Sequence, residues 1–144
     1  MADSTRETAL NALLALLETI DGITVKRNEP ETVTIPAGGL VSLRDGDPGE
    51  PDILLSPTTY AWEHVAEIVV QKQHVDARIR DRDIDVILQA IDIALDNDST
   101  LGGTVEMARP GSPEIITEAV ESAATIKAVL VPVILEYTTK TPLG

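Results

Sequence analysis

Hydrophobic residues recur at helical spacing in the middle of the chain, between residues 81 and 98. Positions three and four residues apart are apolar, and acidic or amide side chains lie between them, which is the pattern of an amphipathic helix. The apolar stripe consists of Ile84, Ile87, Leu88, Ile91 and Leu95. A polar segment and Gly102-Gly103 follow, so we expect residues 81–109 to form a helix, a break and a strand.

This helix has more apolar surface than one sheet needs. A helix that covers a sheet requires an apolar stripe of about 100°, yet Val86 and Ile93 fall roughly 180° away from Ile84 at ~100° per residue. Ala90 and Ala94 lie between these two residues and the main stripe. The additional surface could be buried by a loop of the same chain or by a neighbouring subunit, and the helix pattern alone does not choose between them.

The N-terminal pattern predicts another helix. Ser4 and Glu7 have the spacing of a capping box, in which the hydroxyl and the carboxylate close the first turn. Asp21-Gly22 would end the helix. Its apolar stripe, which Leu16 widens, consists of Leu10, Leu13, Leu14, Leu17 and Ile20. We expect this stripe to cover the core.

Two long segments predict strands, one before and one after the central helix. Residues 60–71 alternate, so that one set of side chains faces a core while the other set, which includes Glu63 and Glu67, is partly in water. Residues 126–138 are rich in β-branched side chains. Pro132 cannot donate a ladder hydrogen bond, so we expect this strand to lie at an edge or to bulge there.

The remaining segments predict short strands and turns. Residues 45–51 contain Gly and Pro so densely that only a turn or a loop fits, and the strands on either side would pair across it as a hairpin. Residues 114–125 allow a helix or a strand, and an extended or loop-like segment is favoured; residues 139–144 are expected to be a loose tail. The whole pattern predicts one α+β domain over residues 1–144, with helices covering a sheet. The expected short strands are residues 23–28, 33–35, 40–44, 53–55 and 104–108.

The charge argues against a surface that grips DNA. The chain has 144 residues, a formal net charge of −13 and no cluster of Lys and Arg, whereas proteins that hold DNA neutralise its phosphates with such clusters. The same charge disfavours an anionic membrane surface. No segment approaches the ~20 apolar residues of a membrane span, and the N-terminus lacks a signal-peptide pattern. We expect a protein that folds in a cytoplasm and has no membrane partner.

Candidate chemistry is sparse. Asp81, Asp83 and Asp85 alternate like the start of a calcium loop, but the sixth position, which needs Gly, is Val86. An acidic first turn matched to the helix dipole explains these aspartates better. His64 lies on the core side of its strand, where a hydrogen-bonded structural histidine is expected. There is no cysteine, phosphate-binding loop or nucleophile motif, so we expect no catalytic residue, no metal site and no cofactor.

Eight short segments, all of them from Leu43 onward, form a pattern of their own. They are Leu43-Arg44-Asp45-Gly46, Leu55-Ser56-Pro57, Glu63-His64-Val65-Ala66-Glu67, Asp98-Ser99-Thr100-Leu101-Gly102-Gly103, Ile126-Lys127, Val131-Pro132-Val133, Glu136-Tyr137 and Pro142-Leu143-Gly144. Together they resemble the tail-terminator proteins of long-tailed phages and gene transfer agents, the family that includes minor tail protein U. The resemblance implies a single mixed, mostly antiparallel sheet with two main helices packed on one face.

The resemblance also implies a structural role in the virion tail, assembled in the cytoplasm of a bacterial host. Six copies would form a ring that caps the finished tail tube and presents a surface to the head-completion or connector protein. DNA would pass through without specific binding. The acidic composition agrees with this role, because a basic lumen would hold DNA that has to slide.

Two groups of residues are candidates for these contacts. We expect Val86, Ile93 and Ala90 to lie in the subunit interface. The docking elements for the tube and the connector are expected in the loops at residues 28–39, 45–51 and 109–125. The acidic candidates for the lumen or its rim are Glu63, Glu67, Asp47 and Glu50.

Two other functions remain open at this point. The chain could be a head–tail connector or completion protein, which differs from a terminator only in its partners. It could also belong to another class altogether, a small cytoplasmic ligand-binding or enzyme domain. A pocket with converging polar side chains and perturbed carboxylates would favour that class.

Overall fold

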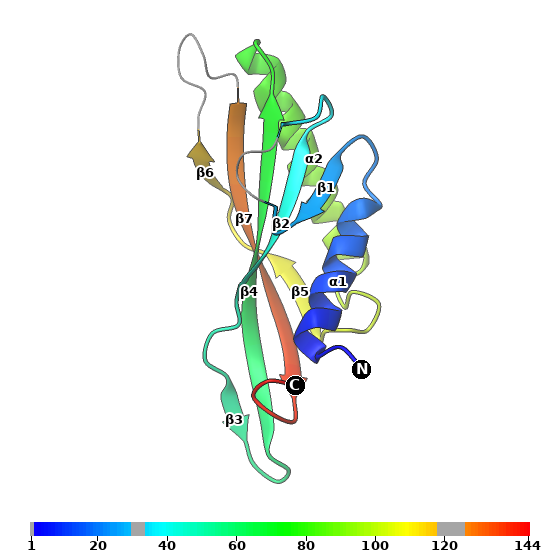
Figure 1. Ribbon diagram of the computed structural model, residues 1–144, viewed down its shortest axis with the longest axis vertical. Coiled ribbons are helices and arrows are strands. Elements are labelled where there is room, and N and C mark those ends of the chain that lie inside the picture. The colour runs from blue at the N-terminus through cyan, green and yellow to red at the C-terminus, as the bar shows by residue number, and fades with distance from the viewer. Residues whose placement is uncertain (1, 30–33, 118–125) are drawn as a thin grey trace.

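The computed structural model describes residues 2–29, 34–117 and 126–144. Within these residues the chain forms two helices and seven strands (Figure 1). The helices are α1 (Thr5–Glu18) and α2 (Ala77–Asn97). The strands are β1 (Thr24–Arg27), β2 (Leu40–Asp47), β3 (Asp52–Leu54), β4 (Thr59–Gln73), β5 (Met107–Pro110), β6 (Glu114–Thr117) and β7 (Ile126–Thr139). Neither helix in this part of the chain is long and apolar enough to cross a membrane.

The strands form one mixed sheet. Its order is β1-β2-β4-β7-β5, with β3 paired to β4 and β6 paired to β7. β1 is parallel to β2, and the other pairs are antiparallel. β4 and β7 pair from Tyr60 opposite Thr139 to Gln73 opposite Ile126, and they run along the length of the molecule as a twisted ribbon (Figure 1). The expected α+β class with a mixed, mostly antiparallel sheet is confirmed.

β7 is an interior strand, and its register with β4 runs without a shift through Pro132, so the prediction that Pro132 marks an edge or a bulge is wrong. β4 pairs with one side of β7, and β5 and β6 pair with the other side. The two shorter strands leave a gap between Val133 and Leu130, and Pro132 lies in that gap. Its carbonyl accepts from the Gly111 N–H at 2.7 Å, so the proline nitrogen also faces the gap, where no ladder donor is required.

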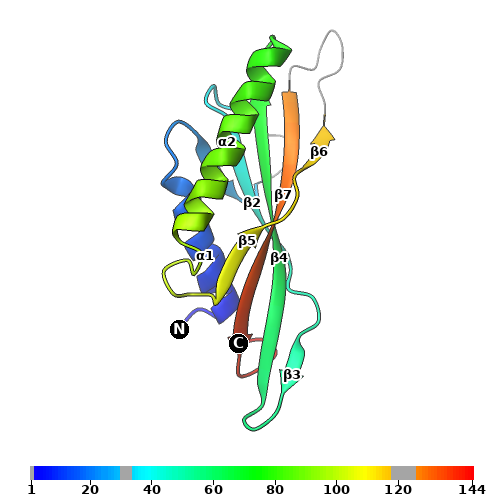
Figure 2. The same cartoon turned by 180° about the vertical axis from the view of Figure 1, so that it is seen from behind.

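One face of the sheet and both helices share the hydrophobic core. Ala66, Ile68 and Val70 alternate along β4 and are buried, as the pattern predicts. Both helices lie on the same side of the sheet in Figures 1 and 2. Burying an aliphatic side chain stabilises the folded state by about 1.5–3 kcal/mol, so packing on this face holds the helices against the strands. The helical contribution is Ala9, Leu10, Leu13 and Leu17 from α1 and Ile84, Ile87, Ile91 and Leu95 from α2.

Only half of the expected capping box forms at the start of α1. The Ser4 hydroxyl oxygen accepts from the Glu7 N–H at 3.1 Å, as predicted. The Glu7 carboxylate instead accepts two hydrogen bonds from the Arg27 guanidinium, each of 2.8 Å. A bidentate pair between charged groups is stronger than a single bond to a backbone N–H, which explains the exchange.

α2 begins at Ala77, four residues before the expected start of the helical segment. The Asp76 carboxylate caps it by accepting from the Arg78 N–H at 2.9 Å. Aspartate is among the strongest N-caps, but the apolar stripe that signals the helix starts only at Ile84.

The three aspartates that follow are therefore not in the first turn, and their expected match to the helix dipole is wrong. Asp81 accepts from Lys127 Nζ at 3.0 Å. Asp83 lies 3.3 Å from Lys72 Nζ. These two carboxylates thus join α2 to β7 and β4.

The expected hairpin between residues 40–44 and 53–55 is also wrong. β2 continues to Asp47 and stays paired with β4 through an irregularity after Arg44. Gly46 permits this close approach, because it has a φ of 71° and a Cβ at that position would lie 1.9 Å from the Val65 carbonyl oxygen. Residues 52–54 pair with β4 instead, where Ile53 is opposite Tyr60.

The strand expected at residues 33–35 is not formed by its described residues, 34 and 35, and the other remaining segments differ from expectation mainly in their bounds. The strand expected at residues 104–108 is β5, which begins three residues later. Residues 114–117 are extended, as favoured. The rest of that segment, residues 118–125, lies outside the described residues, and so do residues 30–33.

The C-terminal residues are held against α1, so the expected loose tail is not observed. Thr139 is the last residue of β7 and is buried. The Gly144 carbonyl accepts from the Thr5 N–H at 3.4 Å and from the Thr5 hydroxyl at 3.2 Å. The C-terminus therefore lies beside the start of the first helix (Figure 1).

Candidate functional site

The outward side of α2 exposes large apolar residues. Val86 is 59% exposed and Ile93 is 60% exposed, whereas Ile84 and Ile91 on the same helix are buried. Within the described residues, then, no loop of the chain covers Val86 and Ile93. Ala90, the third residue expected in the subunit interface, is half-buried one turn away from Val86. We call these three residues the α2 strip.

A groove lies beside the α2 strip, between the end of α1 and the C-terminal half of α2. Its volume is about 530 Å³. Ala90 and Ile93 line it from α2, and Leu16 and Ile20 line it from the end of α1 and the turn that follows. We call it the helix groove. Its remaining lining residues are Thr19, Asp21, Ala94, Asn97 and Asp98. The sequence indicated the α2 wall but not the α1 wall, because periodicity within one helix does not show which helix lies next to it.

The face of the sheet turned away from the core carries acidic side chains. Glu63 and Glu67 lie on this face of β4, on the opposite parity from the buried Ala66 and Ile68. Asp47 is opposite Val65 in the β2–β4 register, which places it on the same face. Three of the four acidic candidates are thus on one face.

The fourth acidic candidate, Glu50, is exposed in the loop between β2 and β3. It does not line the open groove on this face of the sheet, which both Asp47 and Glu67 line. Glu63 lies outside that groove as well, next to Glu136 in the β4–β7 register. The Glu136 carboxylate accepts from Arg109 Nη1 at 2.7 Å, so the positive charge of the Arg109 side chain offsets one carboxylate at this end of the face.

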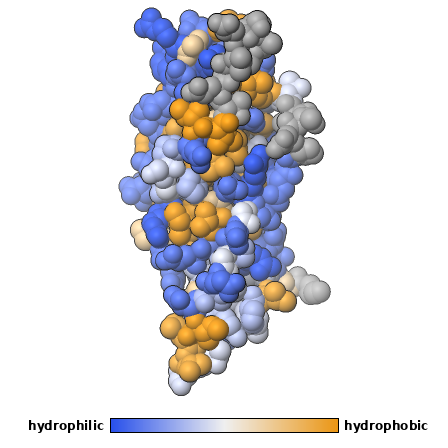
Figure 3. All heavy atoms as spheres, turned by 90° about the vertical axis from the view of Figure 1, so that its left-hand side faces the viewer, coloured by the Kyte–Doolittle hydropathy of each residue, from blue (hydrophilic) through white to orange (hydrophobic). Residues whose placement is uncertain are grey.

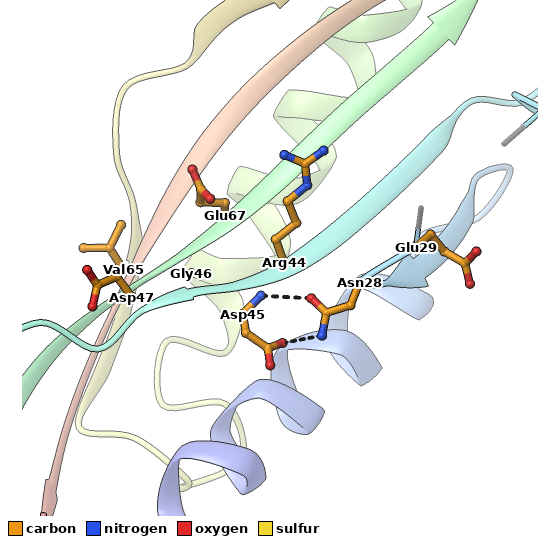
Figure 4. A pocket seen from close by; sticks show the side chains of 8 residues that line it. All are labelled: Asn28, Glu29, Arg44, Asp45, Gly46, Asp47, Val65 and Glu67. Carbon is orange, nitrogen blue, oxygen red and sulfur yellow. Dashed lines mark hydrogen bonds between the residues drawn. The ribbon is translucent and has the colours of Figure 1, made fainter. Parts of the chain in front are cut away.

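The acidic face contains an open groove of about 740 Å³ (Figure 4). Asp47, Val65 and Glu67 lie at one end and Arg44 extends over the strand beside them. At the other end the Asn28 amide donates to Asp45 Oδ1 at 3.0 Å, and the Asp45 N–H donates back to the Asn28 side chain at 3.3 Å. The groove therefore mixes carboxylates with one guanidinium and has no enclosed cavity.

Arg27 connects three elements near this groove. Its guanidinium binds both oxygens of Glu7 on α1, and it donates to Asp45 on β2 at 2.9 and 3.1 Å. Hydrogen bonds from Arg27 hold the pKa of Glu7 and the pKa of Asp45 below their usual values. The same contacts raise the pKa of Arg27, so all three groups are ionised at neutral pH. This cluster is structural: it fixes α1 to the edge of the sheet.

His64 is the structural histidine that the sequence predicted. It is buried, and its Nε2–H donates to the Asp45 carbonyl oxygen at 2.5 Å. Its Nδ1 therefore accepts from the Tyr137 hydroxyl at 2.9 Å. Burial lowers the pKa of His64 and raises the pKa of Tyr137, which keeps both groups neutral at pH 7. Both polar side chains are satisfied within the core.

β3 and the first residue of the turn after it expose a further apolar surface, which the sequence did not indicate. Ile53, Leu54 and Leu55 are 59%, 54% and 78% exposed, and we call them the β3 tip. β3 lies at the lower end of the molecule in Figure 1, and apolar side chains gather at this end in Figure 3. The sequence predicted these three residues as one strand of a hairpin with residues 40–44. Among the described residues, Ile53 and Leu54 instead pair with β4, and Leu55 lies in the turn that follows.

The acidic side chains of the described residues do not form a metal centre. No group of three or more His, Asp or Glu side chains in residues 2–29, 34–117 and 126–144 is arranged to hold an ion. Among the aspartates that resembled a calcium loop, Asp81 and Asp83 bind lysines, and Asp85 accepts from the Gln89 amide at 2.5 Å.

Comparison with protein-family models and with curated protein sequences finds no match. The function is therefore inferred from the surfaces of the protein and from the resemblance of its sequence segments.

Proposed function

We propose that this protein is a tail terminator, a structural virion protein that caps the tail tube as a ring and provides the surface to which the head is joined. The observation that carries the proposal is the α2 strip: Val86 and Ile93 are exposed on a helix whose other side is fully packed. A helix that serves only its own core does not need apolar residues in water. Burial against other copies of the chain gives them a function.

The acidic sheet face supports the same proposal. Glu63, Glu67 and Asp47 lie together on the face without helices, and the net charge of the chain is −13. Carboxylates repel the phosphates of DNA and release no condensed counterions. We place these side chains on the lumen or its rim, where DNA passes without being held. An experimental ring structure with Glu63, Glu67, Asp47 and Glu50 all on the outer wall would remove this assignment.

The test of the proposed function is assembly of the purified protein. Multi-angle light scattering should give the mass of a closed oligomer, and negative-stain microscopy should show rings alone and rings at one end of isolated tail tubes. A chain that remains monomeric at every concentration, and that does not bind tube ends, contradicts the proposal. Rings that bind tailless heads but not tubes would instead identify a head–tail connector, the alternative role in the same particle.

A small-molecule-binding domain is the candidate from a different class, and the groove in Figure 4 is the observation that favours it. The groove is wide and open, whereas ligand sites usually enclose most of the ligand surface. The lowered pKa of its Asp45 is explained by the structural Arg27. Replacement of Arg44 and Glu67 by alanine separates the two functions. A tail terminator with this change still forms rings, whereas a small-molecule-binding domain loses two side chains that line its groove.

A further inference from the structure

His64 is a buried titratable residue whose two ring nitrogens both make hydrogen bonds. It is 1% exposed, its Nε2–H donates to the Asp45 carbonyl oxygen at 2.5 Å, and its Nδ1 accepts from the Tyr137 hydroxyl at 2.9 Å. We propose that these two hydrogen bonds form an acid-sensitive lock: uptake of a proton by His64 releases the end of β2, residues 45–47, from β4. The His64 lock depends on the fold alone and holds whether or not the protein is a tail terminator.

The site of the His64 lock fits the neutral ring and not the charged one. A proton on Nδ1 turns this nitrogen from an acceptor into a donor that faces the Tyr137 hydroxyl. The hydroxyl oxygen would then have to accept, and its hydrogen would have no acceptor among the described residues. The new charge would also be buried, which is costly unless the charge is paired. The charged ring is therefore accommodated only when the contact opens toward water.

The charges around His64 do not compensate for its burial. Burial has the largest effect and lowers the pKa of His64. The hydrogen bond to the Asp45 backbone and the carboxylates of Asp45 and Asp47 act in the opposite direction, whereas Arg6 lowers the pKa further. The Asp45 carboxylate is moreover bound to Arg27. The charged or titratable groups that contact His64, act on it or bind Asp45 with its neighbours are Arg6 and Glu7 on α1, Arg27 on β1, Asp45 and Asp47 on β2, and Tyr137 on β7.

The contact opens toward β2 rather than toward β7. β4 and β7 pair without a shift along the whole of their shared length, so this side is fixed by a continuous ladder. The register between β2 and β4 is irregular after Arg44 and assigns no partner to residues 45 and 46. Segments with few ladder hydrogen bonds open first. Loss of the bond from His64 to Asp45 therefore frees the end of β2.

A second set of contacts at Asp45 responds to a lower pH range. Hydrogen bonds from Arg27 hold the pKa of Glu7 and the pKa of Asp45 below their usual values, so these ion pairs persist down to about pH 4. The pKa of His64 is lowered in the locked state, whereas the released ring has an ordinary pKa near ~6.5. The lock is therefore fully stable above about pH 6.5 and weakens as the pH falls below that value. Between the two ranges Asp45 stays bound to α1 and β1 while its contact with β4 is lost.

The His64 lock lies beside the groove in Figure 4. Asp45, Gly46 and Asp47 line this groove from β2, and Val65 and Glu67 line it from β4. Separation of the two strands moves Asp47 away from Val65, its partner in the register. The width of the groove therefore depends on the pH.

Hydrogen exchange measured by mass spectrometry tests the release. From about pH 7.5 to about pH 5.5, after correction for the intrinsic rate, opening in peptides that cover residues 44–48 should rise about tenfold, because one proton is taken up over this range. Peptides from the β4–β7 ladder should not change. His64→Gln should remove the rise, since its amide can donate to Asp45 and accept from Tyr137 but does not titrate. His74→Gln, the matched change at the other histidine, should keep the rise.

The outcomes decide the role of His64. An equal rise in wild type and His64→Gln, a rise that disappears in His74→Gln, or no rise in wild type overturns the lock. An NMR titration of the His64 ring in wild type gives the same decision if His64→Gln does not fold. Proton uptake by the ring at the pH where exchange rises supports the lock, and a ring that stays neutral while exchange rises contradicts it. None of these measurements depends on assembly, so failure of the lock leaves the proposed function unaffected.

An engineered disulfide tests the direction of opening. Asp47 and Val65 are partners in the β2–β4 register, and Cα atoms of antiparallel partners lie about 4.5–5.5 Å apart, within the range that a disulfide spans. The natural chain has no cysteine, so Asp47→Cys with Val65→Cys gives a single cross-link. The oxidised protein should lose the rise in exchange at residues 44–48, and reduction should restore it. A rise that persists in the oxidised protein places the opening elsewhere and overturns the proposal.

Discussion

The two sides of α2 carry the same kinds of residues in opposite environments. Ile84, Ile87 and Ile91 face the sheet and are buried, whereas Val86 and Ile93 point outward and are more than half exposed. The inner side is sufficient to hold the helix on the sheet, because it continues the core formed by β4 and β7. The difference teaches that the outer side adds no residue to this core, so the proposed contact with another copy is what would give its apolar character a function.

The largest expected effect tests the inner side. Ile91→Ala should lower the free energy of unfolding by about 2–5 kcal/mol, because it leaves a cavity in a packed core. Ile93→Ala, two residues away, should change it by less than about 0.5 kcal/mol. Urea denaturation at concentrations where the protein is monomeric measures both. Equal losses for the two variants would show that the two sides of α2 do not differ in this way.

The next effect concerns assembly. Replacing Val86 and Ile93 together by aspartate should weaken subunit association at least about a hundredfold, since each buried aliphatic side chain contributes about 1.5–3 kcal/mol and a buried charge is costly. The monomer should keep its circular dichroism spectrum. Light scattering across a concentration series gives the association constant. Val75→Asp, a charge added at an apolar position that is 86% exposed and lies outside the strip and the groove, is the control. An unchanged oligomer mass in the double variant would refute the interface.

A smaller effect distinguishes a sterically fitted contact from non-specific hydrophobic association. Ala90→Leu makes the helix groove more apolar but fills part of it. If the groove belongs to a fitted subunit interface, the subunits should associate about tenfold more weakly when it is filled, because overpacking a fitted contact is destabilising. Non-specific adhesion would become stronger instead. Sedimentation velocity of the two proteins at matched concentrations gives the sign of the change.

The smallest effect concerns the wall of the groove that α1 supplies. Arg27 fixes α1 to the sheet, and its removal in Arg27→Met should cost about 1 kcal/mol or less at pH 7, because the Glu7 and Asp45 side chains are 40% and 44% exposed. The pKa values of both carboxyls are lowered in the folded state. Their contribution is therefore present above the unfolded values, near pH 4, and is lost as the pH falls through the lowered ones. The stability difference between wild type and Arg27→Met should thus shrink on acidification below about pH 4; a constant difference down to pH 2 would contradict the ion-pair explanation.

Periodicity predicted the faces of individual elements well. The stripes of α1 and α2, the buried side of β4 and the structural role of His64 all follow from the spacing of apolar residues. Contacts between segments far apart in the chain were harder to predict from the sequence. Residues 52–54 pair with β4, whereas the sequence predicted pairing of residues 53–55 with 40–44, since neither short strand shows that β4 extends beyond β2. The contacts of Arg27 with Glu7 and Asp45 also join residues far apart in the chain, and no local pattern marks them.

The candidate site shows the same division. The sequence alone determined that Val86 and Ile93 lie outside the stripe that covers the sheet, because side-chain direction in a helix follows from residue spacing. Only the tertiary structure decided that these residues stay exposed, and that α1 adds a second wall to form a groove. The physical reason is that burial depends on what the rest of the chain places against a surface, and that is a property of packing between segments rather than of any one segment.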